Sequence, residues 1–266
     1  MLEPRFYIEA LAFPRRTIIR YFFKLLVFTA LLSAGADTWY LLNGEQRISR
    51  MVAAAFPGMA IRDGILHPSM KTPYIPPSYL ITPIFNQLLG LPAMFNQEAD
   101  SLVVVDTAGR SKVPLKVPAI VLKARQAVVV LAGNTVMEFP YENILFGTRD
   151  LEFTADQIDR FLKRHIGVIF SGYFVSTLMH HGVLFFFSIF FLALAAYIFR
   201  VDQKRTLKEY LKTASFAITP IAVGSALVSI SGVKIEWILH ILIFLATIVM
   251  FRAIVSISGR TKELRE

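Results

Sequence analysis

Three histidines are the residues whose type and placement could support chemistry within the apolar part of the chain. His180 and His181 are adjacent in one long apolar stretch, and His240 lies near the start of another. If both stretches cross a membrane, the three imidazoles lie at a similar depth and could bind a metal ion or haem, or relay protons. Adjacent residues on a helix point about 100° apart. The alternative is therefore that each histidine makes ordinary hydrogen bonds near the membrane interface.

Asp37 is the acidic residue within the first apolar stretch, two residues before the aromatic pair Trp39-Tyr40. An ionisable side chain inside a membrane helix is a functional candidate when it faces the other helices. The alternative is that Asp37 faces the lipid headgroups or the domain that follows.

The sequence offers no enzyme motif to accompany these residues. It contains neither G-x-x-x-x-G-K-[ST] nor G-x-G-x-x-G, and neither H-E-x-x-H nor G-x-S-x-G. It also has no cysteine, which excludes disulfides, cysteine-ligated zinc or iron–sulfur sites and thiol catalysis. We therefore expect a protein that is not an enzyme and that has no cofactor and no metal site.

Four charge-poor apolar stretches must position the candidate residues. The chain has 266 residues, of which 55% are hydrophobic, and its mean hydropathy of +0.55 is too high for an ordinary soluble domain. We expect transmembrane helices over residues 21–42, 166–199, 213–232 and 235–257. The second stretch would be about 50 Å long as a helix, against about 30 Å of hydrocarbon. Its first part should therefore form a stalk, or the helix should tilt or break.

The distribution of charge predicts the orientation. Residues 1–24, 200–212 and 252–266 hold 14 of the 28 basic residues and contribute +8 of the net charge of +9. Basic residues accumulate on the cytoplasmic side of membrane proteins. We therefore expect a cytoplasmic segment over 1–20, a cytoplasmic loop over 200–212 and a cytoplasmic tail over 258–266. The same rule explains the basic charge without nucleic-acid binding.

Residues 43–165 should then form a domain outside the cytoplasm. They hold 13 basic and 11 acidic residues, and several short β-branched runs separated by turn residues. Asp63-Gly64 and Gly133-Asn134 predict hairpins, and Thr154 predicts the start of a helix that leads into the second apolar stretch. We expect an α+β domain with a small, mainly antiparallel sheet, inserted between the first and second of four transmembrane helices.

A proline-rich segment over 68–97 interrupts this domain. It carries six prolines, and large apolar side chains lie between them. We single out four aromatic residues as candidate docking residues: Tyr74, Tyr79, Phe85 and Phe95. So many prolines predict an irregular segment. It either packs over the sheet or serves as a lid, a flap on the membrane or a docking surface for a partner.

The third apolar stretch is rich in small residues, which allow helices to approach closely. The candidate packing residues are Ala217, Gly224, Ser225, Ser229 and Gly232. They either pack within this chain or form an interface with another subunit. Pro220 in the same stretch predicts a kink.

Three short motifs accompany this order of one N-terminal span, an outer domain and three C-terminal spans: Ile61-Arg62-Asp63-Gly64-Ile65, Leu102-Val103-Val104-Val105-Asp106-Thr107-Ala108-Gly109 and Ala119-Ile120-Val121-Leu122. With them the chain resembles the uncharacterised bacterial membrane family called domain of unknown function 1189, the YvdJ-like proteins. The resemblance covers nearly the whole chain and implies this architecture. Its motifs are strands and turns, so it implies no catalytic residue.

Together these features favour a non-catalytic accessory or scaffold component of a bacterial envelope complex in the cytoplasmic (inner) membrane. Its partners would be membrane lipids and an envelope protein, bound through the outer domain and the third span. One alternative is a lipid-handling or solute-transport accessory subunit. Another is a membrane protein with haem or a metal bound by its histidines.

Overall fold

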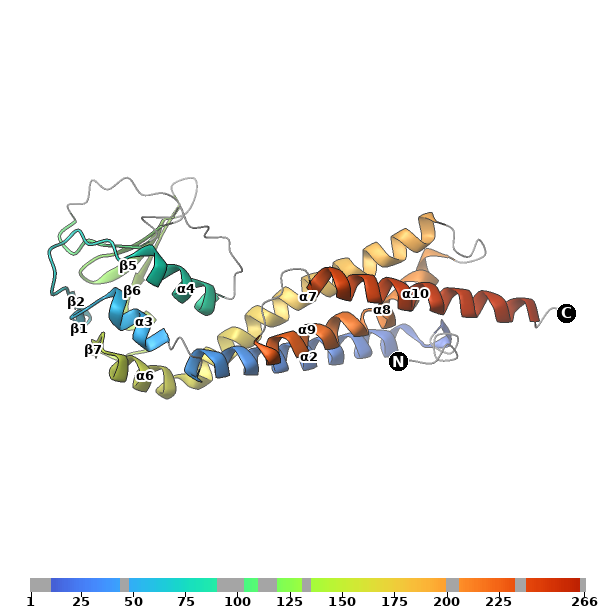
Figure 1. Ribbon diagram of the computed structural model, residues 1–266, viewed down its shortest axis with the longest axis horizontal. Coiled ribbons are helices and arrows are strands. Elements are labelled where there is room, and N and C mark those ends of the chain that lie inside the picture. Colours follow the sequence, from blue (N-terminus) through green and yellow to red (C-terminus); the bar gives the residue numbers. More distant parts are fainter. Residues whose placement is uncertain are drawn as a thin grey trace. The chain divides into compact units, whose positions relative to one another are not determined.

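The computed structural model describes residues 11–43, 48–89, 103–109, 119–130, 135–199, 206–232 and 238–263. The chain divides into two compact units, each treated by itself below (Figure 1). One comprises residues 1–38 and 170–266, and the other comprises residues 39–169.

The first unit is built from long apolar helices. Three helical stretches are long and apolar enough to cross a membrane, Arg15–Asn43, Ile166–Ile198 and Leu207–Ser231, and a shorter apolar helix covers His240–Val255. Long apolar helices of this kind are typical of a membrane protein, because only internally bonded backbone is stable in hydrocarbon. The helices are α2 (Arg15–Asn43), α7 (Ile166–Ile198), α8 (Leu207–Ala217), α9 (Thr219–Ser231) and α10 (Ile238–Glu263).

The apolar span expected over 213–232 lies within the stretch Leu207–Ser231, which the structure divides into two helices that meet at Ile218. Pro220 lies in the first turn of α9 and has no N–H to donate to the carbonyl of Phe216. The hydroxyl of Thr219 donates to that carbonyl instead, at 2.6 Å, and Thr219 also hydrogen-bonds to Tyr21 of α2. Where the sequence predicts a kink at Pro220, the structure has a break between two helices.

Helix α8 also begins earlier than the expected span. A capping box between Thr206 and Glu209 starts it within the predicted loop 200–212. The side chain of Glu209 accepts the N–H of Thr206 at 2.8 Å. The last part of that loop is therefore helical.

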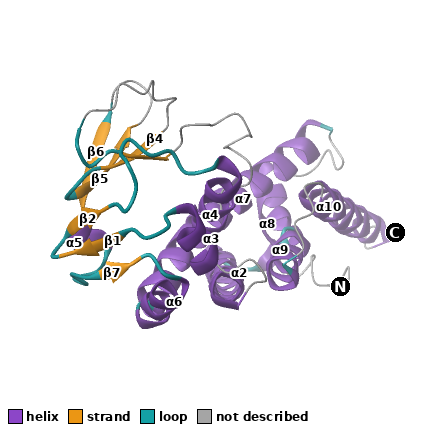
Figure 2. Cartoon of the chain, turned by 60° about the vertical axis from the view of Figure 1, so that its left-hand side comes forward, coloured by secondary structure: helices purple, strands orange, loops and turns teal. Residues whose placement is uncertain are grey.

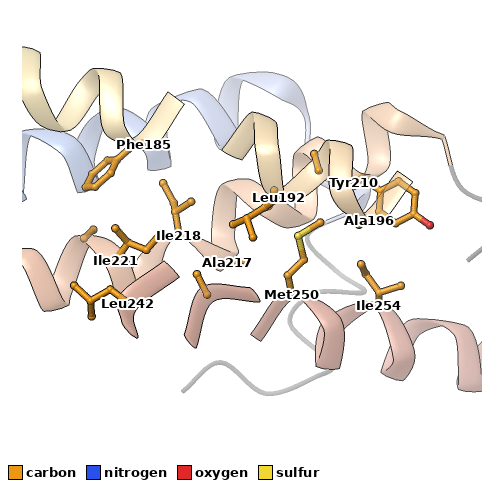
Figure 3. Packing of buried hydrophobic residues seen from close by; sticks show 14 of the residues in the cluster. Phe185, Leu192, Ala196, Tyr210, Ala217, Ile218, Ile221, Leu242, Met250 and Ile254 are labelled. Carbon is orange, nitrogen blue, oxygen red and sulfur yellow. The ribbon is translucent and has the colours of Figure 1, made fainter. Parts of the chain in front are cut away.

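The interior of this unit is an apolar core between α7, α8, α9 and α10, to which α2 contributes Leu26. Figure 3 shows its side chains converging from these helices: Phe185, Leu192, Ala196, Tyr210, Ala217, Ile218, Ile221, Leu242, Met250 and Ile254. Helix α10 packs against both α8 and α9. This arrangement explains why α8 and α9 are rich in alanine at buried positions.

The small residues of the third apolar stretch serve several purposes. Gly224 faces Leu242 of α10 so closely that any added side chain would overlap it, and Ala217 is fully buried. Ser225 and Ser229 are half-buried. Gly232 is exposed and ends α9 in the left-handed conformation with φ 67°, so its role is helix termination. The close approach at Gly224 is therefore made within this chain.

The second unit is an α+β domain with two small sheets. Its helices are α3 (Ile48–Ala55), α4 (Ser78–Leu89), α5 (Tyr141–Ile144) and α6 (Ala155–Arg164). Its strands are β1 (Ala60–Arg62), β2 (Ile65–His67), β3 (Val103–Val105), β4 (Ala119–Leu122), β5 (Gln126–Val130), β6 (Val136–Pro140) and β7 (Leu151–Glu152). The strands form two sheets with orders β2-β1-β7 and β3-β4-β5-β6. Figure 2 shows β2, β1 and β7 beside one another, with β4, β5 and β6 in a separate group.

The expectation of a mainly antiparallel sheet is confirmed, although the strands form two sheets and β3 is parallel to β4. The Asp63-Gly64 hairpin is confirmed, since both residues have positive φ and Arg62 pairs with Ile65. Thr154 is confirmed as the N-cap of α6, where its hydroxyl accepts the N–H of Gln157. The Gly133-Asn134 turn lies outside the described residues.

The expectation of an irregular proline-rich segment is wrong for residues 78–89, which form α4 with Pro83 inside it. Pro83 is the sixth residue of α4 and has no N–H to donate to the carbonyl of Tyr79, so the helix forms despite the loss of one backbone hydrogen bond. Ile81 and Ile84 are buried, and α4 packs against α3. This part of the segment therefore has an internal packing role.

Helix α5 and strand β7 were not anticipated from the sequence. Tyr141, the first residue of α5, is buried and its hydroxyl donates to the carbonyl of Lys123 at 2.7 Å. Burial raises the pKa of this phenol well above its usual range. The side chain therefore remains neutral and ties α5 to the turn that joins β4 and β5.

Replacing Gly224 with leucine should destabilise the helical unit, because the new side chain must displace Leu242. Overpacking of this kind lowers the free energy of unfolding by about 1–3 kcal/mol, measured as thermal unfolding of the full chain in detergent. The matched control is Gly172→Leu on α7, where no atom lies within 4 Å of an added Cβ. Adding Leu242→Ala to Gly224→Leu should restore part of the loss. Equal stability of the Gly224 and Gly172 variants would contradict the close approach.

Candidate functional site

A polar cluster lies between α2 and α7 within the helical unit. It consists of Ser33 and Asp37 on α2 and of Tyr173, Thr177 and His181 on α7, spaced four residues apart on each helix. Residues at this spacing share one face of a helix. In an otherwise apolar helix pair, polar side chains on facing surfaces are the strongest candidates for function.

His181 is the buried centre of this α2–α7 polar cluster. Its side chain is 6% exposed, and its Nε2 lies 3.3 Å from the hydroxyl oxygen of Ser33. The ring stacks on Phe185, with centroids 5.7 Å apart and an interplanar angle of 17°. Nδ1 is buried with no hydrogen-bond partner among the described residues. One ring nitrogen is thus held while the other is available to a further group.

Asp37 and Tyr173 extend the cluster beyond Ser33 and Thr177. Asp37 is half-buried and interacts electrostatically with Tyr173. The hydroxyl of Thr177 donates to the carbonyl of Tyr173, so it is satisfied within its own helix. Of the two sequence alternatives for Asp37, this placement favours the one that faces another helix.

The structure does not gather the three histidines into one site. His180 and His240 are both exposed, and the rings of His180 and His181 are tilted by 54° at 5.5 Å. Within the described part of the chain, no three histidine, aspartate or glutamate side chains are placed to hold a metal ion. The geometry therefore separates His181, which faces α2, from the other two imidazoles.

The candidate docking residues of the proline-rich segment differ in their surroundings. Tyr74 pairs through its backbone with Val105 of β3 at 2.9 and 2.8 Å, and its hydroxyl donates to the carbonyl of Ala55 at 3.0 Å. Tyr74 is thus part of the domain's interior framework. Tyr79 on α4 is 73% exposed and remains available. Phe85 belongs to α4, but its side chain lies outside the described residues, as does Phe95 altogether.

Strand β6 presents an exposed apolar edge that the sequence interpretation missed. It is the last strand of the sheet β3-β4-β5-β6 (Figure 2), and all five of its residues are exposed. Val136, Met137 and Phe139 are 53%, 48% and 40% exposed. By contrast, all three residues of β3 at the other edge are buried. The available sequence signals were Glu138 and Pro140, because charge and proline are typical of edge strands.

The sequence model of the family described as "protein of unknown function (DUF1189)" matches residues 2–254, so the chain belongs to this family. No curated protein matches the chain. No solved structure matches it either.

The Ser33–His181 contact can be tested by a double-variant comparison. Ser33→Ala leaves His181 without the hydroxyl, and an unpaired buried polar group lowers the free energy of unfolding by about 1–3 kcal/mol. Ser33→Ala combined with His181→Phe removes both polar groups, so its thermal stability in detergent should return close to that of the unchanged protein. His180→Phe, at the exposed neighbour, is the control. Additive losses from Ser33→Ala and His181→Phe would contradict a direct interaction.

Proposed function

We propose that this family member is a non-catalytic accessory or scaffold protein of the bacterial cytoplasmic membrane. In this proposal it crosses the membrane four times, keeps both termini in the cytoplasm and inserts residues 43–165, outside the cytoplasm, between its first two spans. The clustered basic residues support the orientation. The lengths and composition of three apolar helices support three of the spans, and the shorter apolar helix His240–Val255 is assigned as the fourth.

The observation that carries the proposed role is the exposed edge of β6. An unpaired edge strand offers a row of backbone donors and acceptors to another extended chain. Its apolar side chains at Val136, Met137 and Phe139 add surface that would leave water on binding, at about 25 cal/mol per Å² buried. A strand with these properties is suited to binding a protein segment by strand addition.

The chemistry of β6 also restricts what it binds. Glu138 lies in the middle of the strand, opposite Val128 of β5. A partner strand on the free side would place a residue next to this carboxylate, and opposite charges favour cross-strand pairing. The partner in this proposal is therefore an envelope protein with an extended apolar segment that carries a basic residue. Helix α9 is not assigned this role, because Gly224 already contacts Leu242.

The orientation can be tested in the natural cysteine-free background. Lys71 and Lys208 are both exposed, and we expect Lys71→Cys to lie outside and Lys208→Cys inside. A membrane-impermeant maleimide added to spheroplasts should label position 71 at once. Position 208 should react only after the membrane is permeabilised. Labelling of 208 but not 71 in intact spheroplasts would reverse the proposed topology.

The docking role of β6 can be tested by site-specific photo-crosslinking in cells. A photoreactive phenylalanine in place of Met137 should give a discrete protein adduct, and the same group in place of the exposed Tyr79 is the matched control. Phe139→Asp should abolish the adduct, because a charge then opposes burial of the apolar edge. An adduct only at position 79 would move the docking surface to α4. An adduct with a differently tagged copy of this chain would show self-association and reject the envelope partner.

A further inference from the structure

A shallow pocket lies in the α+β unit against one face of α6. Its volume is about 290 Å³, and its lining includes Thr148, Asp150, Gln157, Arg160 and Arg164. Arg160 and Arg164 are four residues apart, so both reach the pocket from the same side of the helix. Thr148 and Asp150 come from the chain that follows α5. Neither the exposed edge strand nor the α2–α7 polar cluster includes any of these residues.

The two guanidinium groups are not neutralised inside the domain. Among the described residues, neither Arg160 nor Arg164 forms an ion pair with a carboxylate. Arg160 uses its Nε to donate to the carbonyl of Asp156 at 3.3 Å, which leaves its terminal amino groups available. Lys163, between the two arginines in sequence, is different because it pairs with Asp159 at 2.7 Å. The arginines are therefore placed to bind an anion from solution or from a membrane surface.

The remaining charge of the lining indicates which anion fits. Asp150 also lines the pocket, and its Oδ1 accepts the N–H of Asp63 at 3.0 Å. With two guanidinium groups and one carboxylate, the lining carries a formal charge of +1. A phosphodiester carries one negative charge and offers the oxygen acceptors that arginine binds well. The carboxylate of Asp150 would repel the second negative charge of a phosphate monoester.

Apolar side chains lie next to this polar lining in the same unit. Phe161 lines the pocket, and the exposed ring of Phe146 stacks on it with centroids 6.3 Å apart. Ile166 and Val168, just after Arg164 in the chain, are also exposed. A ligand held at the arginines could therefore place an apolar portion against Phe161 and Phe146, as a phospholipid would.

The length of α7 places this end of the chain at the depth of lipid headgroups. The helix has 33 residues and is therefore about 50 Å long, while a bilayer with its headgroups is about 40–45 Å thick. Arg164 precedes the first residue of α7 by two positions. Under the proposed topology, the arginine pair thus lies next to the outer headgroup layer. This step rests on the proposed function; the chemistry of the pocket does not.

We propose that this pocket binds the phosphodiester of a phospholipid headgroup. Arg160 and Arg164 contact the phosphate oxygens. Gln157 donates one amide hydrogen to Glu152, so its second amide hydrogen is the one offered to the phosphate. Phe146 and Phe161 contact the glycerol and the start of the acyl chains. A free soluble phosphodiester shares the polar part of this chemistry but lacks the apolar part.

The test measures lipid binding by the full chain in detergent by native mass spectrometry. Titration with phosphatidylglycerol should give a bound state whose affinity falls at least about tenfold in Arg160→Ala/Arg164→Ala, because two charge-assisted contacts are lost. Lys163→Ala, which removes a charge outside the pocket, should stay within about twofold. Arg160→Lys/Arg164→Lys should retain part of the affinity. Circular dichroism and thermal unfolding establish that each variant is folded.

The possible results separate the sources of the phosphate. Glycerophosphoglycerol is the soluble diester that lacks the acyl chains of phosphatidylglycerol. If it fails to displace the bound lipid at a concentration at which phosphatidylglycerol binds, the result supports a lipid site. If the soluble diester binds as well as the lipid, the proposal that the ligand is a lipid is wrong, and the pocket is a site for a soluble phosphodiester. Unchanged lipid binding in the folded double alanine variant overturns the pocket altogether. The measurement in detergent depends neither on the orientation nor on β6, so its failure is distinguishable from failure of the cysteine-labelling and crosslinking experiments.

Discussion

The structure depends first on the satisfaction of backbone hydrogen bonds in a long apolar helix. Helix α7 runs without interruption over 33 residues, although Gly167, Gly172 and Gly182 lie within it. In hydrocarbon, an unpaired peptide group would cost several kcal/mol. The low helix propensity of the three glycines is therefore outweighed by the need to keep every backbone hydrogen bond within the helix. Along this continuous helix, Phe185, Leu192 and Ala196 contribute to the apolar core that α8, α9 and α10 share.

The same constraint explains how polar side chains are handled in the helical unit. Where Pro220 removes one backbone donor, the hydroxyl of Thr219 replaces it at the carbonyl of Phe216. Thr29 and Thr38 of α2 likewise donate to carbonyls four residues earlier, at 2.8 and 2.7 Å. His181 departs from this rule within the described residues, because only one of its ring nitrogens is partnered. In the described part of this unit, His181 is therefore the buried polar side chain that can still accept a further hydrogen-bond partner.

Local chemistry made much of the fold predictable. The Asp63-Gly64 turn and the Thr154 cap are encoded by adjacent residues, so the sequence identified them. Helix α4 was missed because the tertiary contacts of Ile81 and Ile84 outweigh the unfavourable effect of Pro83. The division into two sheets was also missed, because β7 is two residues long and exists only by pairing with β1. The candidate sites followed the same rule: spacing identified His181 and Asp37 but not that Ser33 would contact the imidazole.

The α6 pocket illustrates why binding sites are harder to predict than helices. The spacing of Arg160 and Arg164 is visible in the sequence, but it equally fits an ordinary solvated helix face, and Lys163 beside them is neutralised by Asp159. The arginines differ from a solvated helix face because the segment that follows α5 lies beside them. This segment places Thr148 and Asp150 in the same pocket. Because the position of this segment is fixed by the pairing of β7 with β1 and by the bond between Asp63 and Asp150, the pocket is a consequence of the three-stranded sheet. In the lipid site proposed above, folding of this small sheet would be coupled directly to binding at the arginine pair.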